Sequence, residues 1–258
     1  MKWPEEITFV RHGESDFNAK KAQMEQDPMY QELKKAYDTN PDSEQSLNLA
    51  YKVMGQYSLE VSDHNTPLTN VGDKNSQLMA EKLSERIRPP SIIFVSPYER
   101  TRSTLEAMMQ GWPELKSVPV VEEERIREQD HGLALIYSNW RIFNILNPEQ
   151  RRLREIQGPY WYRYPQGENV PDVRERLRSW LTTLTRDYNG ERVLSVTHHL
   201  TILGVRANLE RLSAEEFERL DQEQKPINSG VTTYKGDPTQ GQNGRLILTA
   251  YNLNLHTR

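Results

Sequence analysis

Short runs of apolar residues recur along this chain, and most of them end at a turn residue or a charged side chain. Several lack polar alternation, which is typical of strands buried on both faces of a parallel sheet. Between them, apolar residues fall at helical spacing, as Leu78, Met79 and Leu83 do ahead of Pro89–Pro90. The predicted strands are Ile7–Val10, Ile92–Val95, Val118–Val121, Val193–Val196, Val231–Tyr234 and Leu246–Tyr251, and the predicted helices are Val71–Arg88, Val173–Tyr188 and Thr201–Leu209.

The alternation of strands and helices predicts an α/β fold, with a largely parallel central sheet and helices on both faces. A chain of 258 residues could form one large domain or two small ones. Because the chemically informative residues extend from Arg11 to His198, we expect a single domain over residues 1–258. Its insertions would lie at about 19–63 and 131–169.

Basic and titratable side chains follow three of the predicted strands at the point where each strand ends. Arg11 and His12 follow the first strand, Arg100 begins the helix after the second, and His198 follows a later one. The carboxyl ends of parallel strands meet at one edge, where such sheets bind ligands. Histidine is a nucleophile near neutral pH, and a guanidinium group fits phosphate oxygens. The pattern therefore indicates phosphate chemistry at this edge.

Five motifs resemble those of the histidine phosphatase superfamily and occur in that family's order, from about Ile7 to Thr233. They are RHGES at 11–15 with Asn18 after it, PLTNVG at 67–72, the SPxxRxxxT pattern at 96–104, Arg127–Glu128 followed by Gly132, and Thr197–His198. At position 199 this chain has histidine where relatives commonly have glycine. One such motif would be a weak signal, whereas five in order are a strong one.

The resemblance implies a phosphoglycerate mutase-like fold and assigns roles to single residues. His12 would be the phosphorylated histidine, Glu128 the proton donor and His198 the second histidine of the pocket. Arg100 would join Arg11 in binding the phosphate. The expected catalytic residues are His12, Glu128 and His198, and the expected substrate-binding residues are Arg11, Ser15, Asn18, Arg100 and Arg163.

The residue types fit hydrolysis of a phosphate monoester, in which the phosphoryl oxygens repel an anionic nucleophile. A neutral imidazole at His12 avoids that repulsion. Arg11, Arg100 and a protonated His198 would offset the charge of the equatorial oxygens. Glu128 would protonate the leaving oxygen and then deprotonate the attacking water. No metal and no other cofactor is required by this chemistry.

The residue pattern of the first insertion, about residues 19–63, predicts helices, one of which begins after a cap at Asp42–Ser43. Leu47, Ala50, Tyr51 and Met54 fall at helical spacing behind that cap. The insertion could be a solvated helical hairpin or a lid over the pocket, and the sequence favours neither.

The second insertion, about residues 131–169, contains the segment YWYRYPQGE at 160–168. It resembles the YYYRYPxGE segment of the bisphosphatase half of the bifunctional phosphofructokinase regulator. The resemblance implies that Arg163 and Tyr164 contact a second polar group of the substrate. Packing is an equally open explanation for each of them.

Four alternatives to a metal-independent phosphatase of small metabolites remain. Phosphoglycerate mutase activity is disfavoured because residues 19–24, AKKAQM, stand where mutases have a stretch of the form NxFxGWxD. Fructose-bisphosphatase-like activity and a non-catalytic phospho-ligand-binding protein are two others. A metal-dependent hydrolase is disfavoured because the adjacent His198 and His199 would point to opposite faces, and no HExxH motif occurs.

The composition limits the kinds of molecule that this protein is expected to bind. The chain is 27% charged, has a net charge of −4 and contains no cysteine, and its mean hydropathy is −0.84. The net charge gives no electrostatic reason to expect a nucleic-acid partner, and without cysteine no disulfide can form. The superfamily resemblance implies a small phosphorylated metabolite as substrate. The start of the chain does not resemble a signal peptide, and no apolar run approaches the ~18 residues of a membrane span. The expectation is a cytoplasmic protein without membrane contact, whose oligomeric state the sequence leaves open.

Overall fold

The computed structural model describes residues 2–58, 60–137 and 139–257, and these residues group into two units. Each unit is described by itself. Unit 1 consists of the described residues up to Ser15, His64–Glu128 and the described residues from Asp172 onward, and unit 2 consists of Asp16–Asp63 and Gln129–Pro171. The arrangement as one domain with two insertions stays a prediction.

Unit 1 contains a six-stranded sheet with the order β3-β2-β4-β1-β5-β6. Four neighbouring strands, β3, β2, β4 and β1, are parallel, while β5 and β6 are antiparallel additions beside β1. The prediction of a largely parallel central sheet is confirmed. The strands are β1 (Glu6–Arg11), β2 (Ile92–Val95), β3 (Val120–Glu122), β4 (Arg192–Thr197), β5 (Val231–Asp237) and β6 (Arg245–Leu253).

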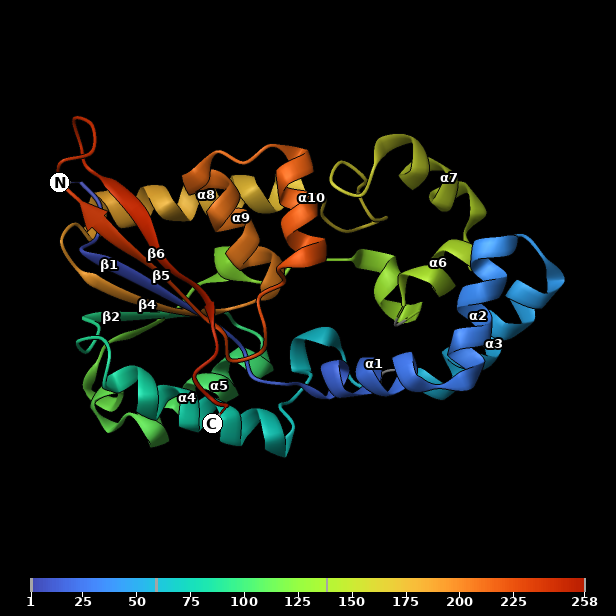
Figure 1. Ribbon diagram of the computed structural model, residues 1–258, viewed down its shortest axis with the longest axis horizontal. Coiled ribbons are helices and arrows are strands. Elements are labelled where there is room, and N and C mark those ends of the chain that lie inside the picture. Colours follow the sequence, from blue (N-terminus) through green and yellow to red (C-terminus); the bar gives the residue numbers. More distant parts are fainter. Residues whose placement is uncertain (1, 59, 138, 258) are drawn as a thin grey trace. The chain divides into compact units, whose positions relative to one another are not determined.

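Helices cover both faces of this sheet, as the sequence predicts: α8 and α9 lie on one face and α4 and α5 on the other (Figure 1). The α-helices of this part of the chain are α4 (Asn70–Ser84), α5 (Glu99–Gly111), α8 (Val170–Asp187), α9 (His199–Glu210) and α10 (Ala214–Glu223). The short 3-10 helices are η1 (Asp63–Asn65), η2 (Pro113–Ser117) and η3 (Glu124–Ile126). Helix α4 ends at Ser84, before the predicted stop at Pro89–Pro90.

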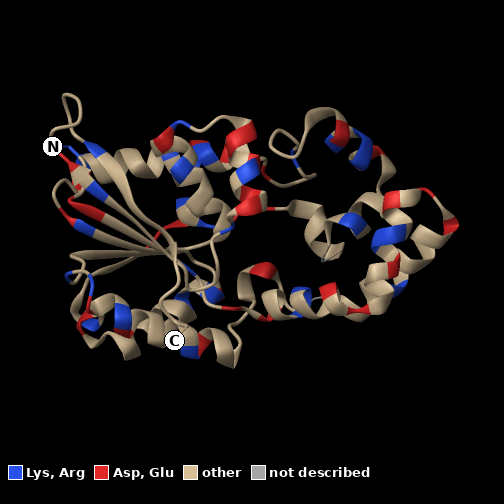
Figure 2. Cartoon of the chain, viewed as in Figure 1, with Lys and Arg blue, Asp and Glu red and all other residues tan. Residues whose placement is uncertain are grey.

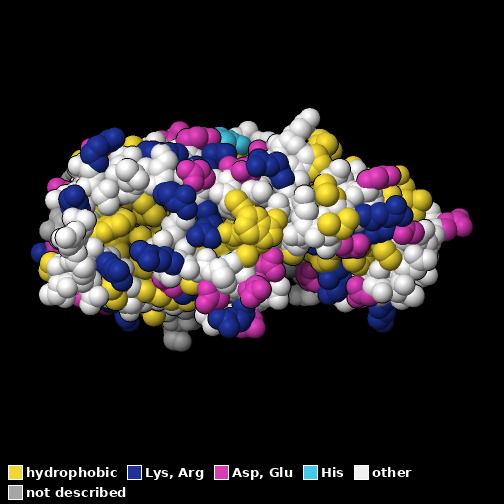
Figure 3. Space-filling view, turned by 90° about the horizontal axis from the view of Figure 1, so that it is seen from above, with side chains coloured by type: hydrophobic (Ala, Val, Ile, Leu, Met, Phe, Trp, Pro, Cys, Tyr) yellow, Lys and Arg dark blue, Asp and Glu magenta, His cyan; other side chains and the backbone are white. Residues whose placement is uncertain are grey.

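Charged residues lie mainly on the helices, while the middles of the strands are uncharged (Figure 2). On the face seen in Figure 3, basic and acidic side chains lie next to one another and next to hydrophobic ones. Such mixing agrees with the small net charge. No helix in the described part of the chain is long and apolar enough to cross a membrane.

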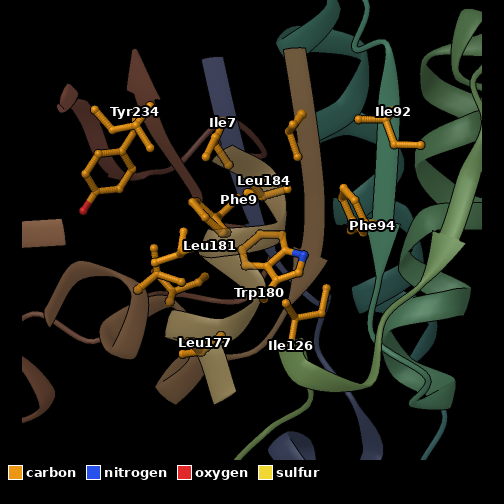
Figure 4. Packing of buried hydrophobic residues seen from close by; sticks show 14 of the residues in the cluster. Ile7, Phe9, Ile92, Phe94, Ile126, Leu177, Trp180, Leu181, Leu184 and Tyr234 are labelled. Atoms are coloured by element: carbon orange, nitrogen blue, oxygen red, sulfur yellow. The ribbon is translucent and has the colours of Figure 1, made fainter. Parts of the chain in front are cut away.

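Aromatic packing fixes α8 on the sheet. Trp180 of α8 lies edge-on to Phe9 and Phe94, with ring centroids 6.0 and 5.6 Å apart (Figure 4). Such contacts add about 1 kcal/mol each beyond the burial of apolar area. Leu177 and Leu184 of the same helix are fully buried. The opposite face is covered by α4 and α5 through a second buried cluster.

The register of the parallel strands brings their carboxyl ends to one edge. Arg11, the last residue of β1, pairs with Thr197, the last residue of β4. Val95, the last residue of β2, pairs with Val196. The residues that follow these strands, His12, His198 and Ser96, are therefore placed at the same edge of unit 1.

Unit 2 is helical, and the helices predicted within residues 19–63 are confirmed. Ser43 caps α3 by accepting a hydrogen bond from the backbone of Ser46. The four residues at helical spacing all lie on α3, where Ala50 is buried while Leu47 and Tyr51 are 39% and 55% exposed. The elements are α1 (Asp16–Gln26), α2 (Pro28–Thr39), α3 (Glu44–Tyr57), η4 (Gly132–Tyr137), α6 (Trp140–Leu146) and α7 (Pro148–Gln157).

Helix α3 carries apolar residues on more than one side, so helical spacing alone does not show which of them are buried. Packing against α2 and α6 selects the side of Leu49, Ala50 and Val53, which are buried in one hydrophobic cluster with residues of both helices. The sequence of α3 alone contains no information about that choice.

Candidate active site

His12 is buried at the carboxyl end of β1, with 3% of its surface exposed. Its Nδ1 lies 2.7 Å from the carbonyl oxygen of Gly13. A carbonyl oxygen only accepts hydrogen bonds, so Nδ1 carries the proton and Nε2 keeps a lone pair in the neutral ring. Burial, followed by the charges of Arg100 and Arg11, lowers the pKa of His12 well below its ordinary value. The ring is therefore a neutral base with an available Nε2.

The turn that follows His12 is packed against the start of α4. A Cβ atom at Gly13 would lie 2.6 Å from the carbonyl oxygen of Gly72, and one at Gly72 would lie 2.1 Å from that of Glu14. Thr69 caps α4 and donates to the Glu14 carboxylate at 2.8 Å. The glycines of the RHG and PLTNVG motifs are thus required by each other, because no side chain fits between these backbones.

His198 lies at the end of β4, fully buried, with its ring centroid 5.2 Å from that of His12. Its Nε2 is 2.7 Å from Oγ of Ser96. The protonated His198 expected in catalysis stays a prediction. Burial, then Arg100 and His12, lower the pKa of His198 well below its ordinary value. A bound phosphoryl group would counteract this effect, since negative charge favours the protonated ring.

Two arginines stand beside the histidines. Arg100, 5% exposed, begins α5, and its guanidinium lies 4.7 Å from the ring of Tyr98, which itself lies edge-on to His198 at 5.0 Å. Arg11 donates from Nη1 to the carbonyl of Pro226 at 2.6 Å. Burial lowers the pKa of Arg11 to about 10, so it remains a cation near neutral pH.

Glu128 reaches the same region from the segment after η3. Its carboxylate accepts a hydrogen bond from the backbone N–H of Leu200, 3.1 Å away, in the first turn of α9. Its charge raises the pKa of Arg11 against the effect of burial. Unit 1 therefore brings Glu128 together with the arginines and histidines that the sequence singled out.

Comparison with known proteins identifies the family of this chain. A model of the histidine phosphatase superfamily, branch 1, matches residues 56–242. The chain belongs to this superfamily. The matched residues begin after the RHGES motif, so the placement of His12 rests on the geometry above and on the motif itself.

Relatives within the superfamily carry both mutase-like and phosphatase names. The phosphoglycerate mutase-like protein AT74H of Arabidopsis thaliana is 29% identical over 238 residues, which cover 84% of this chain and 70% of that protein. Phosphoserine phosphatase 1 of Hydrogenobacter thermophilus is 28% identical over 133 residues, covering 51% of this chain and 58% of that enzyme. A solved mycobacterial glucosyl-3-phosphoglycerate phosphatase, 19% identical, shares the fold with a TM-score of 0.64 over 98% of this chain and 100% of its own.

The remaining residues predicted from the superfamily resemblance are placed less directly. Ser15 is 1% exposed and pairs through its backbone with Leu68 in unit 1. Asn18 lies on α1 and Arg163 in the segment after α7, both in unit 2. Their contacts with substrate stay predictions. Tyr164, also of unit 2, packs against Tyr162 with centroids 5.1 Å apart, which accounts for its position without a ligand.

Two residues, Asn228 and Ser229, form hydrogen bonds with the backbone of His12. The sequence indicates this role only weakly. Nδ2 of Asn228 donates to the carbonyls of His12 and Gly13, each at 3.1 Å. Ser229, with a φ of 53°, donates its N–H to the carbonyls of Arg11 and His12. In the sequence, the signal for this role was the polar pair Asn228–Ser229 just before the strand that begins at Val231. The pairing itself spans more than two hundred residues and is invisible in a local pattern.

His199 is the first residue of α9, and its Nε2 lies 2.7 Å from a carboxylate oxygen of Asp221 in α10. Within the described ranges, no group of three or more His, Asp or Glu residues could hold a metal ion. Independence from metals stays a prediction for experiment.

Proposed function

We propose that the protein is a phosphomonoester hydrolase that forms a phosphohistidine on Nε2 of His12. The observation that carries this proposal is the His12 ring, whose Nδ1 is held by a carbonyl and whose pKa is lowered by burial and then by two arginines. Such a ring is a neutral nucleophile beside the cations that a phosphoryl group needs. Superfamily membership supports the same chemistry.

In the first step, the Nε2 lone pair of His12 forms a bond to phosphorus while the ester P–O bond breaks. Glu128 gives its proton to the leaving oxygen. In the second step, Glu128 takes a proton from water as the water oxygen attacks phosphorus and the P–N bond breaks. Arg11 and Arg100 bind the equatorial oxygens in both steps. One water is consumed, and Glu128 returns to its protonated form.

His198 would assist through its other ring nitrogen. Its Nδ1 is buried and has no hydrogen-bond partner among the described residues. Ser96 can donate its hydroxyl proton to Nε2, which leaves the proton of the neutral ring on Nδ1. Nδ1 can then donate to a phosphoryl oxygen, so His198 need not carry a charge before substrate binds.

The proposed substrate class is a small phosphorylated metabolite. Support comes from the name of one relative, a phosphoserine phosphatase, and from that of a protein with the same fold, a glucosyl-3-phosphoglycerate phosphatase. A screen over a panel of phosphorylated metabolites would identify the preferred member.

We expect the purified protein to release phosphate from para-nitrophenyl phosphate or a sugar phosphate in the presence of EDTA. The reason is that Arg11 and Arg100 supply the positive charge that a metal would otherwise provide. Orthovanadate should inhibit, because its trigonal bipyramid resembles the transferring phosphoryl group. Activity that is lost in EDTA and restored by zinc or magnesium would contradict the proposed mechanism. A protein that binds phosphate but hydrolyses no member of the panel would be a non-catalytic binding member.

Mutase activity is the second candidate, because relatives are named phosphoglycerate mutase-like. Given 3-phosphoglycerate and a bisphosphoglycerate primer, we expect this protein to release inorganic phosphate faster than it forms 2-phosphoglycerate. The motivation is the AKKAQM sequence at residues 19–24, where mutases have NxFxGWxD. Nuclear magnetic resonance of phosphorus distinguishes the two products. Faster isomer formation would make the protein a mutase.

A further inference from the structure

Side chains of other elements bind the backbone carbonyls of the segment that carries Glu128, residues 125–128. This segment follows β3, includes the end of η3 and belongs to no strand. Each of its four carbonyl oxygens, from Arg125 to Glu128, accepts a hydrogen bond from a side chain. The two inner carbonyls, of Ile126 and Arg127, are bound by Thr197 and Thr201, each at 2.6 Å.

The two outer carbonyls are bound by a single residue, Arg176 of α8. Its Nη1 donates to the carbonyl of Arg125 at 2.6 Å, and its Nη2 donates to that of Glu128 at 3.0 Å. Both ends of the segment are therefore held by one planar guanidinium group. A lysine, with one ammonium group, cannot reproduce this fork.

The direction of the Glu128 carboxylate depends on this backbone. The carboxylate is tied to the N–H of Leu200 at 3.1 Å, so its place is set at two points, by that contact and by the main chain behind it. If the main chain shifted, the carboxylate would lose its alignment with the leaving oxygen above His12. Proton transfer is sensitive to such shifts, because a misplacement of about 1 Å can cost about 100-fold in rate.

We propose that Arg176 is a positioning residue for proton transfer by Glu128, acting through the backbone of residues 125–128. The inference rests on the proposed function, since it assigns Arg176 to the proton donor of that reaction. Arg176 also adds positive charge near His198, whose pKa it helps to lower. A test must therefore separate its hydrogen bonds from its charge.

The test compares Arg176→Met, which loses both bonds and the charge, with Arg176→Lys, which keeps the charge. Rapid-quench measurement of phosphohistidine formation uses β-glycerol phosphate, a poor leaving group, and para-nitrophenyl phosphate, a good one. We expect both variants to slow reaction of the glycerol ester by about 10-fold to 100-fold. The nitrophenyl ester should slow by less than about threefold, because its leaving group hardly needs a proton.

A matched control is Arg178→Met on the same helix, since the Arg178 side chain is exposed and forms an ion pair with Glu175 at 2.8 Å. It should react like the wild type with both esters. In the double variant Glu128→Gln/Arg176→Met, the glycerol ester should react no more slowly than with Glu128→Gln alone, because the group that Arg176 positions is already absent.

Several results would overturn the inference. The inference is wrong if Arg176→Met slows the two esters equally or if Arg176→Lys is fully active. It is also wrong if the double variant is slower by the product of the two single effects. Thermal unfolding curves identify any variant that fails to fold, and the conservative lysine variant then decides. A wild-type protein that forms no phosphohistidine and hydrolyses neither ester would instead refute the proposed function, and the inference would fall with it.

Discussion

Turnover should fall by at least about four decades when His12 is replaced by alanine, a loss typical of removing an enzyme's nucleophile. The physical reason is that Nε2 of His12 is the nitrogen left unprotonated by the Nδ1 contact with Gly13. The acid-labile, base-stable phosphoenzyme should disappear as well. Labelling with a radioactive phosphomonoester, followed by acid and base treatment, measures both.

The control for His12→Ala is His256→Ala, because His256 lies in the C-terminal tail, where its backbone N–H donates to Asn254. That variant should label and turn over as the wild type does. If label persisted in His12→Ala, the attacking group would be another side chain, and the neighbouring His198 would be examined first. Thermal unfolding shows whether loss of the buried ring has unfolded the protein.

Replacing Glu128 with glutamine should produce a different pattern, because it removes the proton donor and leaves the nucleophile and both arginines. Substrates with alkoxide leaving groups should form phosphohistidine about two to four decades more slowly. A nitrophenyl ester should suffer much less in this step. Its phosphoenzyme should then accumulate, since the base that activates water is also absent.

Rapid-quench measurement of phosphorylation and dephosphorylation in Glu128→Gln tests this pattern. Glu124→Gln, a change of the same kind in η3, is the matched control and should leave both steps unchanged. Equal slowing of phosphorylation for good and poor leaving groups would show that the proton comes from elsewhere. Failure of phosphohistidine to accumulate would show that Glu128 is not the base for water.

Much of unit 1 was predictable from the sequence because its signals are local. A strand buried on both faces is mostly apolar and lacks regular polar alternation, so Ile7–Val10 and Val193–Val196 were recognisable without their neighbours. Parallel pairing then requires their carboxyl ends to share an edge, which places His12 near His198. The superfamily motifs added Glu128, whose isolated sequence context carries no such signal.

Properties that depend on several distant groups were not predictable. The lowered pKa of His198 results from burial together with the charge of Arg100, and neither can be inferred from the strand that carries it. The buried side of α3 depends on α2 and α6, because that helix is apolar on more than one side.

The sequence by itself determined the fold class, the superfamily and which residue types follow which strands, because hydrophobic periodicity and short motifs are local properties. The tertiary structure decided which nitrogen of His12 is free and which side chains hold the backbone around it. It also decided that Arg176 grips both ends of the Glu128 segment. The contact of His12 with Gly13 joins neighbouring residues, whereas the bonds made by Asn228 and Arg176 join residues tens to hundreds of positions apart. All of them exist only after the chain has folded.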